Sequence, residues 1–292
     1  MLSSIPPAAL ALIAALLLSL WVIFTRMVMR SEKDYVAAGT GMEIFSALAV
    51  LAVLAFGLFP QQPNLPQYIP PEGWLIWLAA IALYTAFIFI TYKSQQTAEA
   101  GERTVVNQLQ IPFALLLAFL FLSEPLTANS LLGAALIISG AVICTYRPNG
   151  FRWKVEGVRL AAFAALLTGA ASLMDKLALT RIPLVLYAIP LYIIPALLGI
   201  FWMGKNLVPR LSSAISKNAV PIFLAGFFSV ASYLLYLLSL SQLPLSQVIV
   251  LFNTNVVLTA ILGALILSEK GNWQQKLAGA ILAFIGAALV AL

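Results

Sequence analysis

A few polar side chains interrupt long apolar stretches of this sequence, and they are the groups that could perform chemistry. Glu43 lies a short way into one such stretch, in GTGMEIFSALAV. A carboxyl group at membrane depth is costly and normally faces a cavity or a partner, because desolvation disfavours its charged form. We predict that Glu43 contacts a substrate or exchanges protons as a coupling group, with an ion pair to Arg26 or Lys33 as the structural alternative.

Amide side chains form a second group of candidates. Asn107, Gln108 and Gln110 lie in one apolar stretch, and Asn253 and Asn255 lie in another. At an offset of 145 residues, Gln108 maps onto Asn253 and Gln110 maps onto Asn255. On a helix, Asn107 and Gln110 share a face while Gln108 points away. We predict substrate contacts for Asn107, Gln110 and Asn255, with interhelical hydrogen bonds as the alternative.

Aromatic side chains form a third group. Trp21 sits well inside the first apolar stretch, and Tyr92 and Tyr187 lie within or near others, as do Tyr192 and Tyr233. Such rings stack on a substrate or donate a hydrogen bond to it, whereas rings at helix ends are typical of the interfacial belt. We predict substrate contacts for Trp21, Tyr92 and Tyr187.

The remaining charges in apolar surroundings lie at the ends of stretches. Asp175 and Lys176 are neighbours, and adjacent residues of a helix do not face each other. Lys176 either binds an anionic substrate or extends its ammonium group to the membrane surface. Glu124 and Glu269 each follow an apolar stretch, and we expect a structural role for both.

Composition sets the class of protein that carries these residues. Of 292 residues, 62% are hydrophobic and only 9% are charged, with a mean hydropathy of +1.02. A soluble domain has about 25% charged residues, so the sequence predicts an integral membrane protein. It contains no His and a single Cys, which argues against a metal or haem site and predicts no cofactor. The net charge of +6 comes from short loops and indicates membrane orientation rather than nucleic-acid binding.

The apolar stretches predict an all-α polytopic fold. A helix needs about 20 apolar residues to cross the hydrocarbon core, and ten stretches approach this length. They are 6–28, 36–59, 74–94, 104–122, 128–146, 157–179, 183–203, 219–240, 244–267 and 273–291.

Two segments of the chain are nearly the same. LSEPLTANSLLGAALIISG begins at Leu122, and LSEKGNWQQKLAGAILAFIG begins at Leu267. The Ser-Glu pair and two glycines, which are seven residues apart in each segment, match between them. Small residues at this spacing share a helix face and allow helices to approach closely. We predict two repeats of five helices each, 1–148 and 149–292.

The basic residues predict how these repeats cross the membrane. Because five is odd, the second repeat enters from the opposite side, and 14 of the 16 Lys and Arg residues then fall on one side. The positive-inside rule makes that side cytoplasmic. We therefore predict inverted repeats, with both termini outside the cell membrane.

These features resemble one known group of proteins. Ten apolar helices in two halves, each half with a Glu before an LxGaxLixxG helix, resemble the drug/metabolite transporter superfamily of EamA type. The resemblance covers essentially the whole chain. It implies that helices 1–4 and 6–9 surround a central cavity, with helices 5 and 10 outside. It also implies a cargo such as an amino acid, a nucleotide sugar, a phosphorylated sugar or a drug. Many members are placed with both termini inside, whereas the charges here predict the reverse.

The sequence therefore predicts a secondary transporter of a small polar metabolite. Inverted repeats let one half rock against the other around a site at the midplane, which gives alternating access. A passive channel or facilitator is the alternative. A polytopic membrane enzyme would need clustered carboxylates or a His, and the sequence has no such cluster and no His. An ATP-driven pump would need a P-loop, which the sequence also lacks. The expected partners are the solute, the bilayer and, through the outer helices, a second copy in a homodimer.

Overall fold

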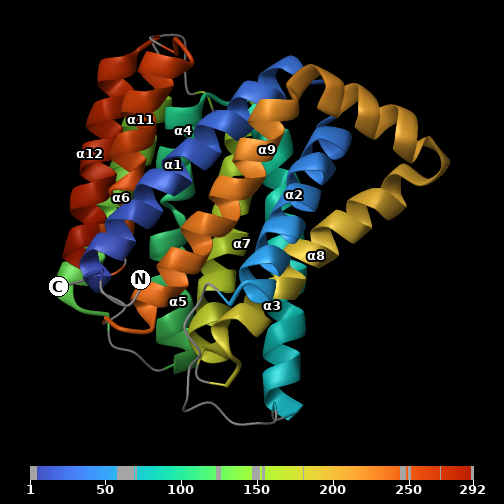
Figure 1. The fold of residues 1–292 in the computed structure, drawn as a ribbon. Coiled ribbons are helices and arrows are strands. Elements are labelled where there is room, and N and C mark those ends of the chain that lie inside the picture. The colour runs from blue at the N-terminus through green and yellow to red at the C-terminus, as the bar shows by residue number, and fades with distance from the viewer. Residues whose placement is uncertain are drawn as a thin grey trace.

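A computed structural model shows how these stretches fold. It describes residues 5–57, 69, 71–122, 126–146, 152, 155–179, 181–243, 248, 251–269 and 271–290. Within these residues the secondary structure is helical and contains no strand (Figure 1). The first half of the chain forms α1 (Pro7–Ser31), α2 (Tyr35–Ala55), α3 (Pro71–Thr97), α4 (Ala100–Asn107), α5 (Gln110–Leu122) and α6 (Ala128–Thr145). The second half forms α7 (Glu156–Ala178), α8 (Leu184–Met203), η3 (Gly204–Asn206), α9 (Leu207–Leu240), α11 (Asn255–Ile266) and α12 (Trp273–Val290).

Several of these helices have the length and composition of membrane spans. Among the described residues there are seven stretches that could cross a membrane on these grounds. They are Pro7–Ser31, Tyr35–Ala55, Pro71–Thr97, Ala128–Thr145, Glu156–Asp175, Leu186–Leu240 and Trp273–Val290. The sixth of these covers most of α8 together with η3 and α9. The predicted count of ten spans stays a prediction.

The fourth predicted span, 104–122, is not one continuous helix. It is divided into α4 and α5 at Gln108 and Leu109. Pro112 explains the break, because proline has no N–H to donate and its ring clashes with the carbonyl four residues earlier, which here belongs to Gln108. The backbone adapts with a tighter turn, in which Ile111 N donates to Gln108 O over 2.9 Å.

The eighth and ninth predicted spans also differ from the structure. α9 begins at Leu207 rather than at 219, and Asn218 within it has non-helical angles (φ −135°, ψ 30°). Pro221 lies just beyond and favours a kink for the same reason as Pro112. α11 begins at Asn255, well inside the predicted range 244–267, whose first residues lie outside the described part of the chain.

The glycines of the repeated segments place α6 against α12. A Cβ atom added at Gly133 would lie 2.5 Å from Gly286 O, and one added at Gly140 would lie 2.6 Å from Gly279 O. The contacts pair a higher residue number on α6 with a lower residue number on α12, so the two helices run antiparallel. The backbones touch because neither helix carries a side chain at these points.

The other large interfaces also join the two halves. α1 packs against α9, α3 packs against α7, and α2 packs against both α8 and α9. Ser232 Oγ donates to Ala14 O over 2.8 Å, and Ser94 Oγ donates to Gly157 O over 2.6 Å. The third helix of each half thus lies along the first helix of the other half.

Charged residues gather at one end of this helical assembly. Each ion pair between described residues joins the first half of the chain to the second. The pairs are Arg26–Glu269, Lys93–Glu156, Arg152–Glu99, Arg152–Glu102, Arg210–Asp34, Lys217–Glu32 and Lys276–Glu99. They lie where α1, α3 and α11 end and where α2, α4, α7, α9 and α12 begin, at the opposite end from the two termini (Figure 1). We call these residues the charged layer.

The outer surface of the helices is apolar. Large hydrophobic side chains are exposed along α3, α6, α8 and α12, as expected for helices in contact with lipid. Examples are Leu75, Leu78, Leu131, Leu132, Phe201, Trp202, Ile281 and Ile285.

Candidate functional site

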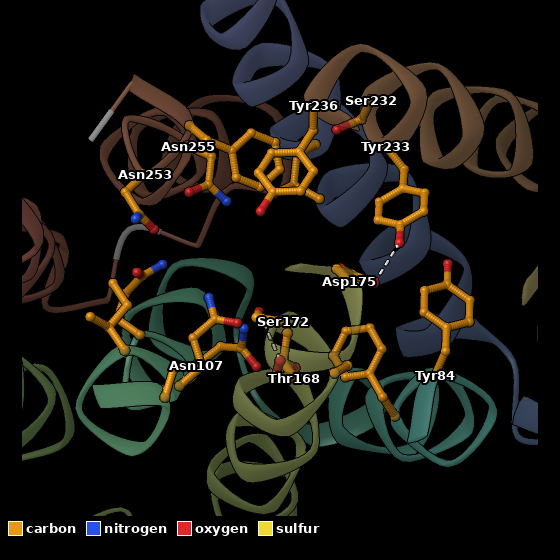
Figure 2. A pocket seen from close by; sticks show the side chains of 18 of the residues that line it. Tyr84, Asn107, Thr168, Ser172, Asp175, Ser232, Tyr233, Tyr236, Asn253 and Asn255 are labelled. Carbon is orange, nitrogen blue, oxygen red and sulfur yellow. Dashed lines mark hydrogen bonds between the residues drawn. The ribbon is translucent and has the colours of Figure 1, made fainter. Parts of the chain in front are cut away.

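A central cavity of about 310 Å³ lies between the two halves (Figure 2). Its wall comes from α1, α3, α4 and α5 of the first half and from α7, α8, α9, α11 and the last residue of α12, Val290, of the second. Among the described residues α2 contributes none to the lining, although the family resemblance implied that helix 2 would line the cavity and helix 10 would lie outside it. Polar side chains from both halves line it. They are Trp21, Tyr84, Arg103, Thr104, Asn107, Gln108, Gln110, Thr168, Ser172, Asp175, Tyr192, Ser229, Ser232, Tyr233, Tyr236, Asn253 and Asn255.

One end of the cavity is rich in amides. Figure 2 shows Asn253 and Asn255 facing Asn107 across the space. The buried atoms Asn107 Oδ1, Gln108 Oε1 and Asn255 Oδ1 have no hydrogen-bond partner within the described part of the protein. Buried polar atoms are nearly always hydrogen-bonded, so these atoms are available to a solute or to water.

Broken helices carry these amides. Asn107 is the last residue of α4, Gln110 is the first of α5, and Asn255 is the first of α11. At a helix end, four backbone groups lack a partner within the helix. Interrupted helices at membrane depth are tolerated where they line a cavity and are typical of solute sites in transporters.

Arg103 is a buried cation in the same wall. It is 2% exposed, its Nη2 donates to Thr91 Oγ1 over 3.0 Å, and its guanidinium carbon lies 5.8 Å from the centre of the Trp21 ring. An aromatic face attracts a guanidinium group at this separation. Arg103 Nε and Trp21 Nε1 are buried and have no acceptor among the described residues.

Asp175 is the carboxyl group of the cavity. Tyr187 and Tyr233 both donate to its Oδ1, the latter over 3.0 Å. Figure 2 shows Asp175 and Tyr233 at the other end of the cavity from Asn253, with Tyr84 beside them. The rings of Tyr84 and Tyr233 have centroids 6.2 Å apart. Asp175 is thus positioned by a cluster of tyrosines.

Glu43 occupies a different environment. It is fully buried on α2, its Oε1 accepts a hydrogen bond from Tyr92, and its Oε2 has no partner among the described residues. The alternative of an ion pair with Arg26 or Lys33 is wrong, because no ion pair of Glu43 occurs among the described residues and Arg26 Nε contacts Glu269 Oε1 at 2.9 Å. Glu269 also accepts from Ala100 N over 2.8 Å, which fits its expected structural role.

The predicted site residues therefore separate into two sets. Trp21, Asn107, Gln110 and Asn255 line the cavity. Glu43, Tyr92 and Tyr187 are fully buried and are outside the cavity lining in the described part of the protein, although Tyr187 reaches it indirectly through Asp175. Glu124 and the side chain of Lys176 lie outside the described residues.

Sequence reasoning missed Arg103 as a site residue and placed Asp175 only at a helix end. A signal for both was present in the spacing. Arg103 precedes Asn107 by four residues and Gln110 by seven, and Asp175 follows Ser172 and Thr168 by three and seven. Residues at these spacings share one helix face. A polar face on each of two helices was therefore readable.

Comparison with known proteins agrees with this architecture. The model of the EamA-like transporter family matches the chain twice, over residues 6–146 and 155–292. The chain belongs to the EamA-like transporter family. It is an integral, multi-pass membrane protein whose family carries small solutes.

Solved structures show the same fold for this EamA-like chain. One protein crystal structure has a TM-score of 0.56 with 19% sequence identity, and the match covers 97% of this chain and 96% of the other. Among curated proteins, none matches the chain.

Proposed function

We propose that this EamA-like protein is a secondary transporter that moves a small polar metabolite across the membrane by alternating access. The observation that carries the proposal is the central cavity, whose wall is shared by both halves and contains unpartnered buried amides and charges. A solute bound there contacts both halves at once. Rocking of one half against the other would then expose the same site to each side of the membrane in turn.

The charged layer supports alternating access because it closes one end of the assembly. Its ion pairs all join residues of the first half to residues of the second. The Arg26–Glu269 pair is nearly buried, with side-chain exposures of 10% and 7%. Movement of one half against the other at this end requires that these pairs separate. In our proposal the structure represents the conformation that is closed at the charged layer.

We propose that the charged layer faces the cytoplasm. The topology predicted from the sequence assigns 14 of the 16 Lys and Arg residues to one side of the membrane, and the positive-inside rule makes that side cytoplasmic. The ion-paired cations of the charged layer belong to these 14. Both termini would then lie outside. Reporter fusions at each terminus test the orientation, and a terminus accessible only from the cytoplasm contradicts it.

Two further predictions about the transporter follow from the sequence. Proton coupling through Glu43 stays a prediction, and because Glu43 is sealed beside Tyr92, coupling would require a conformation that opens it. A homodimer through the outer helices also stays a prediction. The glycine faces of α6 and α12 are occupied by each other, so such a dimer would use their outer apolar faces.

Counterflow in proteoliposomes tests the proposed function. Vesicles containing the purified protein are loaded with a metabolite mixture, and entry of a labelled component is measured with and without a pH gradient. An alternating-access carrier gives faster labelled uptake when the same solute is present inside at high concentration. A channel shows no such stimulation, and flux without stimulation would favour the passive alternative.

A further inference from the structure

The charge of the cavity wall indicates the chemistry of the solute. The wall carries a guanidinium group, Arg103, that has no carboxylate within ion-pair distance among the described residues. Its neighbour Glu102 points elsewhere and pairs with Arg152 over 3.0 Å. Burying an unpaired charge is costly, so this arrangement calls for an anion in the cavity.

Two donors without acceptors lie on neighbouring side chains at Arg103. A guanidinium group has five N–H donors, and Arg103 uses Nη2 on Thr91 while Nε has no acceptor. Trp21 lies beneath the guanidinium group, and its Nε1–H is buried and also without an acceptor. These two side chains are in contact, each has a donor without an acceptor, and Arg103 is charged. An oxyanion with two acceptor oxygens could accept a hydrogen bond from both.

The groups beside these donors have the opposite character. Asn107 and Asn255 line the same cavity, and each has a buried carbonyl oxygen without a donor. Asn107 lies one turn of α4 from Arg103 and so shares its face. A solute whose anionic group lies next to hydroxyl or amine donors would satisfy both sets of atoms.

The charge of the cavity is also polarised along its length. Gly169 of α7 packs against Gln110 O, where a Cβ atom would lie 2.8 Å away. Arg103 precedes this contact by about two turns, and Asp175 follows it by nearly two turns on α7. Val106 of α4 packs near Val158 at the start of α7, and Gln110 packs against Gly169 further along, so α4 and α5 run in the same direction as α7. Arg103 and Asp175 therefore lie toward opposite ends of the cavity. Asp175 repels an anion from the far end, while Arg103 attracts it to the end nearer the charged layer.

We propose that the transported solute carries an anionic group, a carboxylate or a phosphate, and that Arg103 and Trp21 bind this group. Arg103 is then the residue that selects anionic solutes over neutral ones. This inference rests on the proposed function and names the chemistry of the same site.

Binding of matched solutes to the purified protein tests the inference. The carboxylate set consists of the twenty amino acids, and each is compared with its primary amide. Phosphates are glycerol 3-phosphate and glucose 6-phosphate, compared with glycerol and glucose. Ligand-induced thermal stabilisation gives an apparent Kd for each compound. We expect the anionic member of at least one pair to bind about tenfold or more tightly, because hydrogen bonds to charged groups contribute that much.

Variants show whether Arg103 is responsible. Arg103→Gln should remove the preference for the anion, and Arg103→Lys, which keeps the positive charge, should retain part of it. Trp21→Phe keeps an aromatic ring under the guanidinium group but loses the indole N–H, so it should weaken anion binding by about two- to tenfold. Arg159→Gln removes an exposed guanidinium group on α7 and should bind as the unmodified protein does.

Each outcome bears on the proposal. The carboxylate and phosphate arms identify which anion is bound. Equal binding of charged and neutral partners, a preference that persists in Arg103→Gln, or no binding of any anion in the panel overturns it. If Arg103→Gln does not fold, unchanged anion preference in both Arg103→Lys and Trp21→Phe overturns it as well.

Counterflow of the compounds that bind separates this inference from the proposed function. Arg103-dependent binding without counterflow would retain the anion site and contradict the transport proposal. Counterflow of neutral solutes at equal rates in Arg103→Gln would retain the transport proposal and contradict the anion site.

Discussion

The charged layer and the cavity wall both hold buried charges, but the two regions satisfy them in different ways. In the charged layer each cation contacts a carboxylate of the other half, as Arg26 contacts Glu269 and Arg152 contacts Glu102. In the cavity, Arg103 and the neighbouring amides keep atoms without partners. Paired charges hold one arrangement of the two halves, whereas unpaired charges are available to a solute. The first region should therefore control conformation and the second should control recognition.

The largest effect is expected at the nearly buried ion pair of the charged layer. Arg26→Gln leaves Glu269 without its cation, and removing one partner of a buried pair costs about 3–5 kcal/mol. The cost falls on the conformation closed at this end. A Thr104→Cys probe in a Cys144→Ser background should then react faster with an impermeant maleimide applied from the charged side. The preference for anionic solutes should not change.

A second substitution checks that the effect comes from the pair. In the Arg26→Gln background, Glu269→Gln should cost less than it does alone, because the carboxylate no longer has its cation to lose. Full additivity of the two substitutions would show that the pair does not hold the halves together.

Glu43 combines features of the two regions. It is buried, as the Arg26–Glu269 pair nearly is, and like Arg103 it has an atom without a partner among the described residues, Oε2. If it couples transport to protons, Glu43→Gln should abolish solute accumulation driven by a pH gradient and leave exchange without a gradient intact. The amide still accepts from Tyr92, so the folded yield should be retained. Unchanged gradient-driven accumulation would exclude the coupling role.

Smaller effects are expected from the amides of the cavity. Asn255→Ala and Gln110→Ala should each lower the rate of counterflow by about two- to tenfold, the value of one neutral hydrogen bond. Gln274→Ala removes an exposed amide at the start of α12 and is the matched control. Normal counterflow in both cavity variants would show that these amides only pack helices together.

The smallest effect is expected at a pair of the charged layer whose side chains are about one-third exposed. Two hydrogen bonds from Arg210, of 2.6 and 2.8 Å, hold the pKa of Asp34 below its usual value. The folded protein therefore releases this proton more readily than the unfolded chain does. The stabilisation is complete above the unfolded pKa of about 3.9 and is lost as the pH falls through the lower folded value. Asp34→Asn should flatten this part of the stability curve in thermal unfolding between pH 5 and 3.

Much of the fold could be predicted from the sequence. Apolar length located most of the helices within a few residues, and the glycines of the repeated segments predicted close helix contact, which α6 and α12 make. These features depend on local composition, which a sequence displays directly. The break between α4 and α5 was also encoded locally, by Pro112, but an apolar run was taken as a continuous helix.

The site was less predictable because it depends on which faces meet. Trp21, Asn107, Gln110 and Asn255 line the cavity, and their contact with a substrate stays a prediction. Glu43 resembles a site residue by its depth, but Tyr92 covers it, and no local pattern shows that contact. Arg103 and Asp175 looked like charges at helix ends, since a count of apolar residues ignores the face on which a charge lies. Helical spacing would have corrected both.

The antiparallel glycines also limit how this chain can evolve. At each of the four positions a new side chain meets the backbone carbonyl of the opposing glycine. A carbonyl has no alternative rotamer, and the opposing residue has no side chain left to shorten. A second substitution within the pair therefore cannot restore the contact, as it often can when two side chains collide. A random library should tolerate fewer replacements at these positions than at their neighbours, and suppressors should arise elsewhere in α6 or α12.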